Sequence, residues 1–329
     1  MADTVSKQVN LCGVDQVELF GKNDLHLRML REKFEVKLVA RGETLTIEGS
    51  EREVEAVLKV LDDLLSSVRK GIPLCEGDVS YTMSMVRENN GEKLNSLHEG
   101  RAEYPDLKKL IRAKTVGQQE YVQAMHAYDI VFSIGPAGTG KTYLAMAHAA
   151  TCLRRRDVDR ILLVRPAVEA GESLGFLPGA YEEKVGPYLR PLYDALYEMV
   201  PAEKIRKFLE MGVIEVAPLA YMRGRTLNNS FVILDEAQNT TLDQMKMFLT
   251  RLGFNSKVVI TGDITQIDLS HKEDSGLVQI QSILRAIDGI RFIYLTEKDV
   301  VRHRLVQEII KAFDRFESAG RRPDRRGGR

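Results

Sequence analysis

The chain has 329 residues, of which 44% are hydrophobic, and its 47 basic and 47 acidic side chains cancel to a formal net charge of zero. This length allows two domains with buried cores, while the longest apolar runs, such as 231–234, are far shorter than the about eighteen residues that indicate a membrane span. The amino-terminal sequence MADTVSKQVN resembles no export or organelle signal, so we expect a cytoplasmic protein without a membrane partner.

Residues 1–70 are predicted to form a small α+β domain. Apolar residues three and four positions apart indicate helices, and short apolar runs bounded by turn residues indicate strands. The expected elements are, in chain order, a strand over 17–20, a turn over 21–24, a helix over 25–34, strands over 35–40 and 44–48 joined by a hairpin at 41–42, and a helix over 51–68.

Residues 71–107 are polar, and glycines and asparagines interrupt any periodicity, which indicates a linker with room for one short helix. The last segment, 319–329, is rich in Gly, Pro and Arg and is expected to be a disordered tail. Its residues 321–329 include five arginines and one aspartate, so the tail is a basic arm that suits nucleic acid.

Between 108 and 318, strands and helices alternate along the chain. Nearly all the strand candidates are continuous apolar runs, which is the pattern of parallel strands buried on both faces. The strands are expected over 130–134, 160–164, 213–217, 231–234, 257–261 and 290–295, with helices such as 142–155 and 242–252 between them and a last helix over 301–318. We therefore predict an α/β fold with a doubly wound parallel sheet, preceded by the small α+β domain.

The sequence VFSIGPAGTGKTYLAMA places an apolar strand, a Gly-rich loop and a helix in direct succession. This context favours a phosphate-binding P-loop over a chance Gly-rich turn, because the loop must deliver backbone amides to phosphate oxygens at a helix start. Lys141 would reach the β- and γ-phosphates of ATP, and the Thr142 hydroxyl would bind Mg²⁺. The candidate nucleotide-binding residues are Gly135, Pro136, Ala137, Gly138, Thr139, Gly140, Lys141 and Thr142.

An acidic pair follows the apolar run in FVILDEAQN, at the carboxyl end of a predicted strand, where α/β folds place their ligands. Asp235 is expected to help hold Mg²⁺, and Glu236 is the candidate general base for the attacking water. The alternative is that the pair only caps the segment that follows.

A third polar segment, TGDITQIDL, follows the strand expected over 257–261. The amide of Gln266 could contact the γ-phosphate or orient water and so sense whether the nucleotide is intact. Taken alone, the segment could equally be a turn capped by an aspartate. Because it follows the P-loop and the acidic pair in chain order, we predict a catalytic or sensing role for Gln266.

With these three motifs in this order, the chain resembles the PhoH-like family, whose ATPase domain is similar to the cores of superfamily 1 helicases and has a RecA-like P-loop fold. The resemblance covers nearly the whole chain. It is carried by GPAGTGKT, RPAVEAGESLGFLPG, APLAYMRGRTL, LDEAQNTTLDQMKMFLTR, TGDITQIDL and the late DVVRH.

The resemblance implies further roles. Gln118, or else Gln119, matches a glutamine that reads adenine, and Arg302 matches a late arginine that acts as a finger on the γ-phosphate in cis or in a neighbouring subunit of a ring, such as a hexamer. An exposed glutamine and a surface arginine are the alternatives. Arginines 165, 223 and 225 are candidates for phosphate or nucleic-acid contact, or else for structural ion pairs.

The first domain, 1–70, is similar to a KH-like RNA-binding fold. The loop of that fold that clamps the nucleic-acid backbone is Gly-x-x-Gly, whereas this chain has Gly21-Lys22-Asn23-Asp24. Asp24 adds a negative charge where phosphate would pass and lacks the conformational freedom of glycine. The domain therefore either contacts RNA weakly or is a scaffold.

The function that these features favour is Mg-dependent ATP hydrolysis coupled to RNA binding or remodelling, as in an RNA helicase. The resemblance also implies a metal-dependent ribosomal-RNA endoribonuclease as a partner. Two other classes compete with this function. A small-molecule kinase uses the same P-loop but has no need of the Gly-Asp-x-x-Gln segment, and an ATP-dependent binding switch would use ATP to control assembly without unwinding.

Overall fold

The structure, a computed structural model, describes residues 4–71, 73–88, 103–104, 107, 111–166, 181–301, 305–306, 309 and 312–313, and for 103–104, 181–188 and 272 it describes the backbone alone. The chain divides into two compact units, Met1–Gly91 with Val301–Arg329, and Glu92–Val300. The predicted helix over 301–318 and the tail over 319–329 lie largely or wholly outside the described residues. Within the described part of the chain, no helix is long and apolar enough to cross a membrane.

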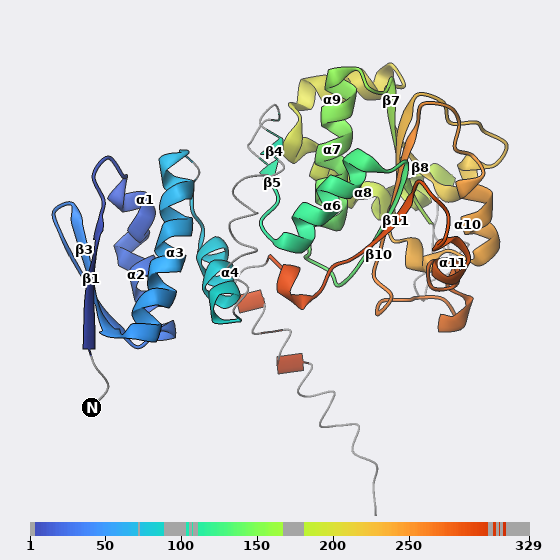
Figure 1. The fold of residues 1–329 in the computed structure, drawn as a ribbon. Helices are drawn as coiled ribbons and strands as arrows, with labels where there is room; N and C mark the ends of the chain where they lie inside the picture. Colours follow the sequence, from blue (N-terminus) through green and yellow to red (C-terminus); the bar gives the residue numbers. More distant parts are fainter. Residues whose placement is uncertain are drawn as a thin grey trace, which may run out of the picture. The chain divides into compact units, whose positions relative to one another are not determined.

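The first unit is a three-stranded antiparallel sheet with helices (Figure 1). Its strands are ordered β1-β3-β2, with β3 paired to both neighbours. The elements are β1 Thr4–Asn10, α1 Gln16–Phe20, the 3₁₀ turn η1 Lys22–Asp24, α2 Leu25–Lys33, β2 Val36–Arg41, β3 Thr44–Ser50, α3 Glu51–Arg69 and α4 Glu76–Arg87. The Gly21–Asp24 loop lies between α1 and α2, and the resemblance of this unit to a KH-like fold stays a prediction.

The predicted strand over 17–20 is wrong, because these residues form helix α1. Asp15 begins the helix by accepting hydrogen bonds from the backbone amides of Val17 and Glu18, the capping pattern of a helix start. The strand that the fold requires is β1, which was missed because its residues are mostly polar and exposed.

The first unit extends to Gly91, beyond the predicted end of the first domain at residue 70. The reason is α4, which lies in the segment expected to be a linker. One face of this helix is buried, including Val79 and Met83, and the buried hydroxyl of Thr82 donates a hydrogen bond of 2.9 Å to Asp63 of α3. Helix α4 therefore packs as part of the first unit.

The second unit contains the predicted parallel sheet, and all six expected strands are confirmed. Every strand pairs in parallel with its neighbours, in the order β11-β6-β10-β9-β7-β8. The elements are β4 Glu103–Tyr104, β5 Ile111–Arg112, α6 Val116–Ala127, β6 Ile130–Ile134, α7 Lys141–Arg155, β7 Arg160–Arg165, α8 Tyr181–Met199, α9 Ala202–Glu210, β8 Ile214–Pro218, β9 Ser230–Leu234, α10 Leu242–Leu249, β10 Lys257–Gly262, α11 Gly276–Leu284 and β11 Ile290–Tyr294.

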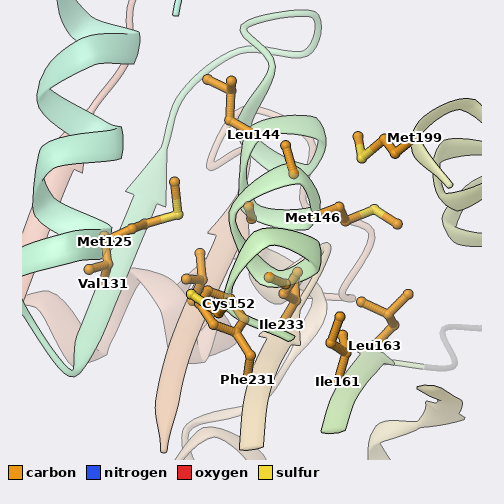
Figure 2. Close-up of a cluster of buried hydrophobic side chains, with 14 of the residues drawn as sticks. Met125, Val131, Leu144, Met146, Cys152, Ile161, Leu163, Met199, Phe231 and Ile233 are labelled. Carbon is orange, nitrogen blue, oxygen red and sulfur yellow. The ribbon is translucent and has the colours of Figure 1, made fainter. Parts of the chain in front are cut away.

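Helices cover both faces of this sheet. Because successive side chains of a strand point to opposite faces, Ile161, Leu163 and Ile233 pack with α6, α7, α8 and α9, whereas Leu162 and Val232 pack with α10 and α11. Figure 2 shows part of the first layer, where Leu144, Met146 and Cys152 of α7 meet strand side chains such as Ile233 and Phe231. The continuous apolar runs in the sequence thus reflect burial on two faces.

The strand order decides which loops meet. Strand β10 lies between β6, which leads into the P-loop, and β9, which ends at the acidic pair, while β7 flanks β9 on the other side. Since the strands are parallel, the segments after β6, β10, β9 and β7 all emerge at one rim of the sheet. The predicted site residues near 135, 165, 235 and 262 are therefore brought together by topology.

Candidate nucleotide-binding site

The P-loop joins the end of β6 to the first residue of α7, Lys141. Gly135 is required by a close approach, because a Cβ there would collide with the carbonyl oxygen of Leu295 after β11. Gly138 and Gly140 have φ angles of 86° and 80°, a region that residues other than glycine rarely adopt. Thr139 adds a hydrogen bond of 2.9 Å from its hydroxyl to the Pro136 carbonyl. The loop is thus a tight turn that ends at a helix start, where anions bind favourably.

The Lys141 ammonium is turned back over this loop. Its Nζ donates hydrogen bonds to the carbonyl oxygens of Gly135 at 2.6 Å and Pro136 at 2.8 Å. The positive charge therefore lies beside the backbone that a P-loop uses to hold phosphates. The predicted contact of Lys141 with the β- and γ-phosphates stays a prediction.

Thr142 and Asp235 meet across the rim. The Thr142 hydroxyl donates to Asp235 Oδ1 at 2.6 Å, and the hydroxyl of Thr261, at the end of β10, donates to the same oxygen at 2.7 Å. A hydroxyl and a carboxylate are the oxygen donors that Mg²⁺ prefers, and Mg²⁺ commonly uses one or two protein oxygens beside phosphate and water. The donor set fits this ion. The buried Thr261 was missed in the sequence, because a lone threonine in an apolar strand gives no signal.

Glu236 follows Asp235 with a φ of 53°, a left-handed conformation that costs energy for a residue other than glycine and that occurs at functional sites. Its side chain is 37% exposed and has two hydrogen-bond partners among the described residues. Arg165, at the end of β7, donates to Glu236 Oε1 at 2.8 Å, and the amide of Gln238 donates to Oε2 at 2.6 Å. The carboxylate of the candidate general base is therefore held in one orientation from both sides.

Gln238 links this carboxylate to the segment after β10. Its side chain is buried and accepts a hydrogen bond of 3.1 Å from the backbone amide of Asp263, while its amide also donates to the Gln266 carbonyl at 3.1 Å. Asp263 in turn accepts from the backbone amide of Ala137 in the P-loop, at 3.1 Å. A chain of hydrogen bonds thus connects Glu236, the 263–266 turn and the P-loop.

The side chain of Gln266, the predicted sensor, is exposed at the same rim, and its backbone amide closes the turn onto the Asp263 carbonyl. The predicted sensing role of its side chain stays a prediction. Glu236 is instead contacted directly by Arg165 and by Gln238, and no local sequence pattern indicates the role of Gln238.

Comparison of the sequence with known proteins assigns the chain to a family. The chain matches the family model described as PhoH-like protein over residues 110–314. It is 51% identical over 301 residues to a PhoH-like protein of Bacillus subtilis (strain 168), which covers 92% of this chain and 94% of the relative. The chain belongs to the PhoH-like protein family.

Further comparisons add breadth. A PhoH-like protein of Mycobacterium tuberculosis (strain ATCC 25618 / H37Rv) is 52% identical over 310 residues, covering 92% of this chain and 86% of the relative. Among solved structures, the SWI2/SNF2 ATPase core of Sulfolobus solfataricus in complex with dsDNA aligns over 55% of this chain and 44% of that chain, with 14% identity and a TM-score of 0.34. The solved structure is too distant to add to what the strand order shows.

Gln118 of this PhoH-like chain lies at the start of α6 and contacts the P-loop. Its amide nitrogen donates to the Thr139 carbonyl at 3.0 Å, and its side-chain oxygen accepts from the Lys114 backbone amide at 2.7 Å. The predicted reading of adenine by Gln118 stays a prediction.

The remaining arginines of the PhoH-like motifs separate into three cases. Arg225 forms a bidentate ion pair with Glu215 of β8, and this hydrogen bonding raises its pKa above the usual value, so its structural alternative is favoured. Arg223 is exposed. Arg302 lies outside the described residues, as does most of the RPAVEAGESLGFLPG motif after Arg165 and Pro166.

Proposed function

We propose that this PhoH-like protein hydrolyses ATP with Mg²⁺ and couples hydrolysis to RNA binding or remodelling in the cytoplasm. The observation that carries the proposal is the meeting of Thr142 and Asp235 across the rim, beside Glu236 and Lys141. A chance Gly-rich turn would not bring a hydroxyl after Lys141 within 2.6 Å of a carboxylate 93 positions later in the chain.

Each site residue takes one role in this proposal. The backbone of 135–142 and the Lys141 ammonium bind the phosphates, and Thr142 and Asp235 hold Mg²⁺, which supplies positive charge to the phosphate oxygens when bound. Glu236 accepts a proton from the attacking water. Its orientation is maintained by Arg165 and Gln238, which keep one carboxylate geometry without moving a proton themselves.

Two residues would couple phosphate state to movement. Gln266 stands in the turn that contacts both Gln238 and, through Asp263, the P-loop, so loss of the γ-phosphate could be transmitted through this turn. Arg302 would serve as a finger on the γ-phosphate, in cis or from a neighbouring subunit of a homo-oligomeric ring such as a hexamer.

The RNA part of the proposal rests on the first unit and the tail. The α1-loop-α2 arrangement supports a KH-like role, whereas the loop residue Asp24, with a φ of 56°, places a carboxylate beside the expected phosphate path. The basic segment 321–329 would add salt-dependent, sequence-independent affinity. A metal-dependent ribosomal-RNA endoribonuclease is the proposed protein partner.

The test is phosphate release by the full chain with Mg-ATP, with and without single-stranded RNA. We expect RNA to stimulate turnover, and Glu236→Gln to abolish it while nucleotide binding persists. Absence of Mg-dependent turnover in both conditions would reject the proposal. A strand-displacement assay on RNA duplexes then separates a motor from the alternative, an ATP-dependent binding switch, which would turn over without unwinding.

A further inference from the structure

Helix α6 bonds to the P-loop at two successive turns. The Gln118 amide donates to the Thr139 carbonyl at 3.0 Å, and the buried Tyr121 hydroxyl donates to the Lys141 carbonyl at 3.1 Å. The two side chains are three positions apart and therefore project from the same face of the helix. Between their two acceptors lies Gly140, whose φ of 80° lies in the left-handed region that favours glycine.

These two hydrogen bonds fix the directions of backbone amides in the loop. In a planar trans peptide the C=O and the following N–H point in opposite directions. The Thr139 carbonyl shares its peptide with the Gly140 amide, and the Lys141 carbonyl shares its peptide with the Thr142 amide. Holding both carbonyls toward α6 therefore points both amides away from α6, which is the kind of preorganisation that phosphate binding by backbone amides needs.

The Gln118 side chain is committed to the protein at both ends. Its Oε1 accepts from the Lys114 backbone amide at 2.7 Å, and its Nε2 donates to the Thr139 carbonyl at 3.0 Å. Gln118 is only 4% exposed. A glutamine that reads a purine has to present an amide donor and acceptor to the base, and this buried amide presents neither edge to the surface.

We infer that Gln118 is a positioning residue for the P-loop, acting together with Tyr121, and that the site accepts nucleoside triphosphates with little regard to the base. The inference rests on the proposed function for the presence of a triphosphate in this loop. It names the substrate class of the site by its phosphates, which the loop binds, and departs from the role that the family resemblance implies for Gln118.

Reading of the base by Gln118 and positioning of the P-loop by Gln118 predict very different degrees of discrimination between nucleoside triphosphates. A site built to hydrogen-bond one substrate group rejects an analogue lacking it by factors of about 10⁴ or more, because buried partners are left unpaired. A brace behind the phosphates acts equally on every triphosphate. We therefore expect wild-type dissociation constants for ATP, GTP and inosine triphosphate to agree within about tenfold, since remaining differences come from stacking and desolvation of the base.

The experiment is isothermal titration of the full chain with each of the three triphosphates in Mg²⁺, with phosphate release measured in parallel. Gln118→Ala and Tyr121→Phe should each weaken binding of all three by a common factor, about two- to tenfold, because each removes one hydrogen bond to the P-loop. Gln123→Ala is the matched control, because Gln123 is an exposed glutamine on the same helix, and it should leave all three constants unchanged.

Three results would overturn the inference. One is a wild-type preference for ATP over inosine triphosphate of about a hundredfold or more, whether or not Gln118→Ala removes it. Another is a Gln118→Ala chain that binds all three as tightly as the wild type. The third is a Tyr121→Phe chain that loses binding of ATP but not of GTP and inosine triphosphate. If Gln118→Ala does not fold, the Tyr121→Phe constants and the wild-type ratio of the ATP and inosine triphosphate constants decide. Equal binding without turnover would instead reject the proposed hydrolysis and leave the inference standing.

Discussion

Helix α7 carries polar side chains at its amino end and two ionisable side chains in its buried part, and the fold treats the two places in opposite ways. At its amino end, Lys141 and Thr142 lie at the polar rim among hydrogen-bonding partners. About two and three turns further on, His148 and Cys152 are buried, and Figure 2 shows Cys152 in the apolar layer. Side chains at the rim remain charged or polar because they have hydrogen-bonding partners, whereas ionisable side chains in the apolar layer remain neutral because water is excluded.

The pKa values of the buried groups show the second regime. Burial, followed by the nearby charges of His126 and Lys257, lowers the pKa of His148 to about 3. Burial also raises the pKa of the Cys152 thiol to about 11. Both groups are therefore neutral at pH 7, and the His148 ring packs edge-on against His126 and near Phe231 as an uncharged aromatic group.

The largest effect is expected at the rim, from Asp235→Asn. Removing this carboxylate should lower turnover by about 10³-fold or more, since a bound Mg²⁺ would lose a charged ligand, and titration of ATP should show an affinity that depends less on Mg²⁺ than in the wild type. Thr261→Val is the matched control, because it removes one hydrogen bond to the same oxygen and retains the charge. Equal losses in the two variants would contradict the assignment of Asp235 to the metal.

A smaller loss is expected from Gln238→Met, which retains side-chain length and removes the amide. Steady-state kinetics should show kcat reduced by about 10- to 100-fold with KM for ATP little changed, because Glu236 loses one of its two orienting partners. Gln279→Met in α11, outside this network, is the control. A raised KM with unchanged kcat would indicate that Gln238 serves nucleotide binding instead.

The buried layer should make the stability of the fold depend on pH, whereas changes at the rim should alter turnover and the effect of Mg²⁺. His148 binds a proton near pH 6.5 when unfolded and near pH 3 when folded, so below about pH 6.5 the unfolded chain holds more protons. Stability is then expected to fall as pH falls, by up to about 1.4 kcal/mol per pH unit from this group. Urea unfolding between pH 4 and 8 should show a shallower slope in His148→Leu. His271→Gln, at an exposed histidine, should leave the slope unchanged.

Sequence patterns gave the apolar layers and the charged residues of the rim, but not the contacts between them. The six strands and the P-loop are each encoded in a short stretch of sequence, so apolar runs and glycine spacing were enough to predict them. Thr261 and Gln238 gain their roles because β10 lies between β6 and β9, and no local pattern encodes that order. Strand β1 was not predicted for a related reason, because its polar residues form a strand by pairing with β3, which is distant in the chain.

The smallest effect separates two buried serines and tests how far partners matter inside the sheet. The Ser133 hydroxyl of β6 has no hydrogen-bond partner among the described residues, whereas the Ser230 hydroxyl of β9 donates to Asn228 and accepts from Arg160. Ser133→Ala should therefore leave stability unchanged or raise it by up to about 1 kcal/mol, because no bond is lost and a polar atom leaves an apolar place. Ser230→Ala should cost about 1 to 3 kcal/mol, because Arg160 loses its acceptor. Chemical unfolding of the two variants at pH 7 measures the difference, and a larger loss in Ser133→Ala would show that its hydroxyl has a partner, such as a buried water, that sustains the P-loop strand.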